Sequence, residues 1–123
     1  MNKLINILVV EDNKERIEWF KKEFGDCRLI VEKTAPRAKR WLNREKWDVI
    51  FLDHDLGDRV FVNSDDENTG YQVAKYIRAN PKNHMTPVIV HSWNPEGAAN
   101  IVSVLPHAHR AMFGTFNRSI ING

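Results

Sequence analysis

Residues 4–12 read LINILVVED, an apolar run broken only by Asn6 that ends abruptly in the acidic pair Glu11-Asp12. A run so rich in Ile, Leu and Val is typical of a strand buried on both faces, as in a parallel sheet. A second run, VIFL at residues 49–52, ends in Asp53. Because parallel strands end at the same edge of their sheet, we expect these acids to lie near one another.

Helices are expected between the strands all along the chain. Strands are predicted at residues 4–10, 27–32, 48–52, 88–91 and 110–113, and helical spacing or cap residues place helices around residues 17–24, 38–42, 71–79 and 95–105. We expect Asp12 to cap the first helix with Glu15 in capping-box spacing, and Thr34 to cap the second. Residues 57–69 are a polar loop with a short extended piece at 59–62. This order predicts βαβ units and a doubly wound parallel sheet.

Bulk composition limits the class of protein. The chain has 123 residues, a net charge of +2 and a single cysteine, Cys27. This length fits one domain, here residues 1–123, and one cysteine cannot form an internal disulfide. The first apolar run is too short to span a bilayer, so we expect a cytoplasmic protein with no membrane partner. The charge is too small to indicate DNA binding by itself.

Polar side chains follow the first, third and fourth strands. They are Glu11, Asp12, Asp53, His54, Asp55, His91, Ser92 and Asn94. Carboxylates gathered in one crevice repel one another, and a cation such as Mg²⁺, which prefers oxygen ligands, would relieve the repulsion. Bound Mg²⁺ usually shares its shell with phosphate oxygens. Ser92 could donate to such an oxygen, and histidines exchange protons near neutral pH.

The pattern resembles the receiver domains of bacterial response regulators over residues 4–113. Glu11-Asp12, Asp53 and Ser92 match the family's acidic pair, phospho-accepting aspartate and Ser or Thr, and Thr69-Gly70-Tyr71 opens a similar third helix. The resemblance implies a flavodoxin-like five-stranded sheet in the order 2-1-3-4-5. The chain departs from the family in three respects: Arg110-Ala-Met-Phe replaces the usual Lys-Pro, the loop after Asp53 is longer, and the last helix is short or missing.

The two added histidines, His54 and His91, resemble an atypical branch, the cyclic-phosphate processing receiver-like domains. That resemblance implies a Mg²⁺-dependent site acting on cyclic or terminal phosphates of RNA or nucleotides, as a phosphodiesterase or phosphohydrolase. The expected metal ligands are Glu11, Asp12, Asp53 and Asp55. The expected catalytic residues are Asp53, His54 and His91, and the expected phosphate-binding residues are Ser92 and Asn94.

Several of these residues also have a simpler interpretation. The acidic pair suits any helix N-terminus, and Asp55 can begin the turn at Gly57. Both histidines can be satisfied core residues. The basic residues Arg37, Arg40 and Arg44 share a helix face that is more often simply solvated than a nucleic-acid footprint. Trp93 can wall the crevice or offer a stacking face.

Three functions follow from these residues. The first is a metal-dependent enzyme whose partner is a phosphate-containing small molecule or an RNA end. The second is a stand-alone receiver phosphorylated on Asp53 by a phosphodonor or partner protein, which the missing lysine opposes. The third is a module that binds a nucleotide or a protein without turnover.

Overall fold

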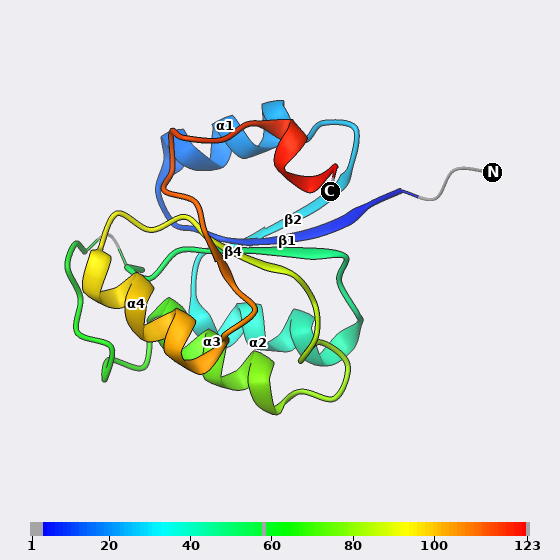
Figure 1. Cartoon of the computed structure of the whole chain (residues 1–123). Helices are drawn as coiled ribbons and strands as arrows, with labels where there is room; N and C mark the ends of the chain where they lie inside the picture. The colour runs from blue at the N-terminus through cyan, green and yellow to red at the C-terminus, as the bar shows by residue number, and fades with distance from the viewer. Residues whose placement is uncertain (1–3, 58, 123) are drawn as a thin grey trace.

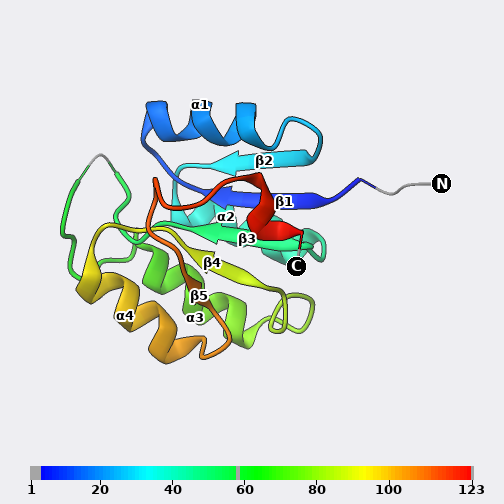
Figure 2. The same cartoon turned by 45° about the horizontal axis from the view of Figure 1, so that its top comes forward.

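The computed structural model describes residues 4–57 and 59–122. Within them, parallel strands form one five-stranded sheet in the order β2-β1-β3-β4-β5, as expected. Their bounds are β1 (Asn6–Val10), β2 (Arg28–Glu32), β3 (Val49–Leu52), β4 (Val88–Val90) and β5 (His109–Arg110). Strands β1 to β4 point toward the side where the long loop after β3 lies (Figure 2).

Helices cover both faces of the sheet (Figure 1). One face carries α1 (Lys14–Glu23) and the short 3-10 helix η1 (Arg118–Ile121), and the other carries α2 (Ala35–Arg44), α3 (Gly70–Ala79) and α4 (Pro95–Val104). This arrangement follows from right-handed crossovers in a doubly wound sheet. None of the described helices is long and apolar enough to cross a membrane.

Alternate residues of the central strands form two cores. Leu8, Val10, Ile50 and Leu52 face α2, α3 and α4. Ile7, Val9, Val49, Phe51 and Ile89 face α1, whose Phe20 and Phe24 pack on them. Because the strands are buried on both sides, they carry no polar alternation, as the sequence indicated.

The structure corrects several local predictions. Asn13, not Asp12, caps α1 by accepting a hydrogen bond from the Arg16 amide at 3.0 Å. The Glu11 carboxylate takes the amides of Asp12 and Asn13 instead, so the helix begins one residue later. Residues 59–62 form no strand, because Phe61 has φ 51° and breaks the extended path.

The last strand is shorter than expected, whereas the last helix is as short as the sequence indicated. Strand β5 covers two residues, although the amides of Ala111 and Phe113 still donate to carbonyls at the end of β4. The last helix is a four-residue 3-10 turn. The amide of Arg118 donates to Glu23, and its guanidinium pairs with Asp26, which holds the turn against the end of α1.

We expect Gly70→Ala to destabilise the fold. A Cβ at Gly70 would overlap the backbone carbonyl of Asp53, because the Gly70 amide donates to the next carbonyl, that of His54, at 2.9 Å. Overpacking of this kind costs about 1–3 kcal/mol of unfolding free energy, measurable by urea denaturation. Gly25→Ala is the control, because a Cβ there would meet nothing closer than 3.4 Å. Equal stability of the two variants would contradict this packing.

Candidate functional site

A pocket of about 320 Å³ opens at the carboxyl edge of the sheet. Its walls come from the end of β1 with the first turn of α1, the ends of β3 and β4, and the loop after β3. They are Glu11, Asp12, Asn13, Arg16, Asp53, Asp55, Arg59, Val60, Phe61, Ser92, Trp93 and Asn94. The pocket therefore gathers every site residue expected from the sequence except the two histidines.

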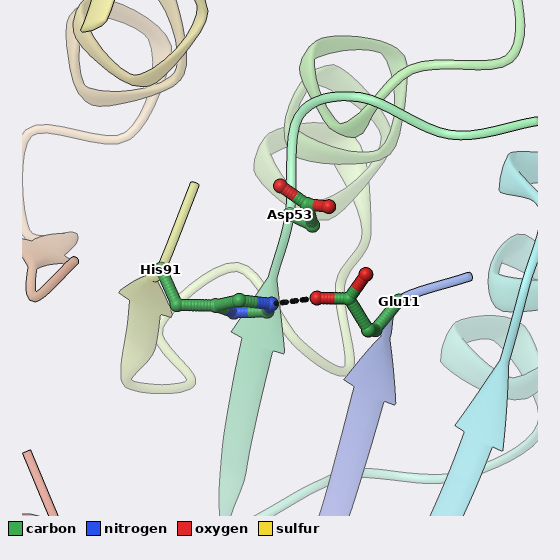
Figure 3. A group of neighbouring side chains, drawn as sticks. All are labelled: Glu11, Asp53 and His91. Carbon is green, nitrogen blue, oxygen red and sulfur yellow. Dashed lines mark hydrogen bonds and ion pairs between the residues drawn. The ribbon is translucent and has the colours of Figure 1, made fainter. Parts of the chain in front are cut away.

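Backbone hydrogen bonding between strands continues one residue beyond β1, β3 and β4. It therefore aligns the first residues after these strands with one another. The amide of Glu11 donates to Glu32, that of Asp53 to Val10 and that of His91 to Leu52. Since β3 lies between β1 and β4, Glu11 and His91 flank Asp53. Figure 3 shows the three side chains converging from these strand ends.

Glu11 and His91 form a fully buried hydrogen-bonded pair. The imidazole Nε2 lies 2.9 Å from the Glu11 Oε1, as the dashed line in Figure 3 marks, and both residues are 0% exposed. Burial alone would raise the pKa of Glu11, but the hydrogen bond and charge of His91 outweigh it and lower this pKa below its ordinary value. Glu11 is therefore held ionised.

The pKa of Asp53 is shifted in the opposite direction to that of Glu11. Burial, followed by the negative charge of Glu11, raises the pKa of Asp53 to about 8, although Arg16 and a hydrogen bond from Ser92 act against the rise. Asp53 is only 4% exposed. The pKa values of these two neighbouring carboxyl groups are thus shifted in opposite directions.

The donor set fits a divalent cation. Ligand atoms of Glu11, Asp53 and His91 all lie within 4.8 Å of one another. Two carboxylates suit Mg²⁺, and a cation between them would relieve the repulsion that keeps Asp53 protonated. Asp12 lines the same pocket and is half-buried. Of the expected metal ligands, Asp55 is committed elsewhere, as described below.

Arg16 is a site residue that the sequence reasoning missed. Its Nη1 lies 3.5 Å from Glu11 Oε1 and 3.8 Å from Asp53 Oδ2. Its guanidinium lies over the rings of Trp93, at 4.3 Å, and Phe113, at 5.1 Å. A basic residue in the first turn of the helix that follows an acidic pair was the available signal.

His54 lies beneath the pocket rather than on its wall. Both ring nitrogens have partners: Nδ1 lies 2.8 Å from Asp55 Oδ1, and Nε2 lies 2.9 Å from Ser64 Oγ. The ring is fully buried against Gly97, where a Cβ would overlap it. These contacts favour a structural role for His54, in holding the loop, over the expected catalytic one.

Asp55 and Asn94 belong to the same supporting network. The Asp55 carboxylate accepts the amides of Phe61 at 2.7 Å and Val62 at 3.1 Å. Burial would raise the pKa of Asp55, but hydrogen bonds, first from His54 and then from Asn94, lower it. The Asn94 side chain caps α4 through Gly97 and donates to Asp55. Both residues line the pocket with their polar atoms already engaged.

Comparison with known structures identifies the class of fold. A receiver domain of a sensor histidine kinase, PA1611 from Pseudomonas aeruginosa, crystallised with magnesium in its active-site cleft, has a TM-score of 0.72 at 22% identity, with 98% of this chain and 93% of that chain covered. Chemotaxis protein CheY4 from Vibrio cholerae has a TM-score of 0.73 at 16% identity, covering 98% and 94%. The chain therefore has the receiver fold.

A sequence comparison identifies the family, which is a more specific assignment than the fold. The sequence profile described as "Cyclic-phosphate processing Receiver domain" matches residues 6–107, most of the chain. The chain belongs to this family. A search among curated proteins found no match.

The raised pKa of Asp53 predicts a pH-dependent penalty on stability. Asp53 is protonated in the folded protein below about pH 8 but ionises near 3.8 when unfolded. The penalty is thus absent below about pH 3, grows as pH rises, and is complete above pH 8. We expect Asp53→Asn to lie within about 1 kcal/mol of the wild type at pH 4 and to exceed its unfolding free energy by roughly 2 kcal/mol or more at pH 8.

Denaturant titrations at several pH values in metal-free buffer measure this difference. It should persist in 0.5 M NaCl, because salt screens buried pairs much less than exposed ones. A constant difference between the two proteins from pH 4 to pH 8 would show that Asp53 is ionised throughout.

Proposed function

We propose that this chain hydrolyses a cyclic phosphodiester in a reaction that depends on a divalent cation. The observation that carries the proposal is the close set of Glu11, His91 and Asp53, which places two crowded carboxyl groups at a ligand-sized pocket where a cation would relieve their repulsion. Membership of the cyclic-phosphate processing family supports the choice of substrate. The proposed substrates are small cyclic nucleotides or RNA ends, and the proposed location of the protein is the cytoplasm.

Glu11, Asp12 and Asp53 would hold the cation. Binding there requires Asp53 to lose its proton, so affinity for the cation should rise with pH. The magnesium in the cleft of the Pseudomonas receiver domain supports the choice of metal. A bound Mg²⁺ neutralises phosphate charge and favours ionisation of a water molecule.

Arg16 and Ser92 would position the phosphate. The Arg16 guanidinium already lies beside two carboxyl groups, and it provides a cation where this chain lacks the lysine of typical receivers. The Ser92 hydroxyl accepts the Asn94 amide and donates its one hydrogen to Asp53. With Asp53 bound to the cation, Ser92 would turn that hydrogen to a nonbridging phosphate oxygen, and Arg16 would bind a second one.

The Glu11–His91 pair would move the proton. In the reaction the water oxygen bonds to phosphorus, the bond from phosphorus to one ring oxygen breaks, and that oxygen takes a proton to give a phosphomonoester. His91 is fully buried and is not on the pocket wall, so a proton that it holds must pass through Glu11. His91 is therefore proposed as a positioning and proton-storing residue rather than one that touches substrate.

Phosphorylation of Asp53 is the second candidate function. The receiver fold and the hydrogen bond from Ser92 favour it. Incubation with acetyl phosphate and Mg²⁺, followed by intact mass measurement, would detect an aspartyl phosphate. A stable adduct on the wild type, absent from Asp53→Asn, would favour signalling over hydrolysis.

We expect purified protein with Mg²⁺ to open adenosine 2′,3′-cyclic monophosphate, and chelation to abolish the reaction. Asp53→Asn and Glu11→Gln should each lower kcat by about 10²–10³-fold, because they remove the cation ligands and the proton path. His91→Asn should lower kcat and shift its pH profile, since it acts only through Glu11.

The matched control is His84→Asn, which changes an exposed histidine outside the pocket. Its kcat and pH profile should equal those of the wild type. Product is followed by chromatography or phosphorus NMR. Absence of turnover in the wild type, or full activity in Asp53→Asn, would overturn the proposed hydrolysis.

A further inference from the structure

The pocket has an aromatic wall beside its charged floor. Phe61 and Trp93 line it together with Asp53 and are 72% and 56% exposed, among the most exposed large apolar side chains of the described residues. Neither ring belongs to a core cluster, so packing in the protein interior does not explain their positions. Exposed aromatic rings on a pocket wall mark a place where a flat ligand can stack.

Trp93 is held in one orientation although it is exposed. Its indole Nε1 donates to the Phe113 carbonyl at 2.9 Å, which satisfies its only polar group. The Arg16 guanidinium lies over the ring at 4.3 Å. A ring fixed at its polar edge and exposed over half its surface loses little conformational freedom when a ligand stacks on it.

Phe61 occupies a backbone conformation that its side chain disfavours. Its φ of 51° lies in the left-handed region, where bulky residues are rare. The Asp55 carboxylate enforces this turn by accepting the amides of Phe61 and Val62. Since neither burial nor backbone preference explains a phenylalanine here, the turn is better explained by the ring that it presents to the pocket.

The chemistry of the occupant follows from Arg16. This one side chain contacts the carboxyl groups of the proposed phosphate site on one side and the Trp93 ring on the other. A ligand whose phosphate reaches Arg16 therefore has its next group close to Trp93. A pocket of about 320 Å³ is at the small end of small-molecule sites, which favours one nucleotide over a protein segment.

We propose that Trp93 and Phe61 form a stacking site for the nucleobase of a nucleotide whose phosphate lies at Asp53 and Arg16. The inference rests on the proposed function for the phosphate position. It adds that the enzyme recognises a base and does not act on cyclic phosphates in general. Stacking on aromatic side chains tolerates different bases, so selection is for a base as such.

Binding of stable phosphomonoesters tests this site without requiring turnover. Calorimetry in Mg²⁺ compares adenosine 2′-monophosphate with glycerol 2-phosphate, which lacks a base. We expect the nucleotide to bind the wild type at least about tenfold more tightly, and Trp93→Ala to lose about tenfold of that preference. Trp93→Phe, which keeps a stacking ring but cannot donate to Phe113, should retain most of it. Using the ratio of the two affinities cancels any effect of Trp93 on Arg16.

The variant Phe61→Asn distinguishes an effect on nucleotide binding from an effect on the stability of the fold. Asparagine tolerates the left-handed conformation, so this variant should be at least as thermally stable as the wild type while its nucleotide preference falls severalfold. Met85→Ala is the control, because Met85 is 71% exposed but lies outside this pocket. It should keep the full preference.

The results separate the two proposals. A wild type that binds both ligands equally, or Trp93→Ala with an unchanged preference, would overturn the stacking site even if cyclic phosphates are hydrolysed. A base preference that depends on Trp93 in a protein without turnover would keep the stacking site and remove the hydrolysis.

Discussion

A buried carboxylate, Glu11, must be compensated at the end of β1, and the rest of the site depends on how this is done. His91 supplies the compensation from the end of β4, at 2.9 Å. Because β3 lies between β1 and β4, the pair brackets Asp53, the residue that ends the central strand. Burial, and then the negative charge of Glu11, make an ionised Asp53 unfavourable, so Asp53 stays protonated or takes a cation. The strand order thus brings Glu11, Asp53 and His91 together, and the charge of each then affects the others.

The aromatic core beneath the site keeps this pair in place. His91 packs edge-on against Phe20 of α1, with ring centroids 5.2 Å apart, and lies near Phe51 and Phe113. Trp19 and Phe116 extend the cluster. Within the residues that the structure describes, a short 3-10 turn stands where a last helix would cover this face, and these rings, drawn partly from the C-terminal segment, fill the space. Helix α1 therefore carries both the packing below His91 and the Arg16 cation above it.

The sequence predicted the sheet well because buried parallel strands carry a strong apolar signal, and the strand ends followed from it. It located the pocket residues for the same reason. It could not assign individual contacts. The Glu11 carboxylate accepts the Asn13 amide while Asn13 caps α1, and Asp55 is one of the partners that enclose His54, and neither contact has a signal in the sequence. Arg16 was missed because an arginine in a helix is usually a solvated residue, and only the fold places it between Asp53 and Trp93.

The protonation of Asp53 also bears on which chemistry the site favours. A phosphoryl acceptor must attack as a carboxylate, but burial and the Glu11 charge hold Asp53 protonated up to about pH 8. A cation would release that proton and at the same time occupy the carboxylate as a ligand. In the proposed hydrolysis the nucleophile is a water molecule, and the Glu11–His91 pair lies beside Asp53 to carry its proton. The raised pKa of Asp53 thus weighs against its phosphorylation while no cation is bound, and it is consistent with the proposed hydrolysis.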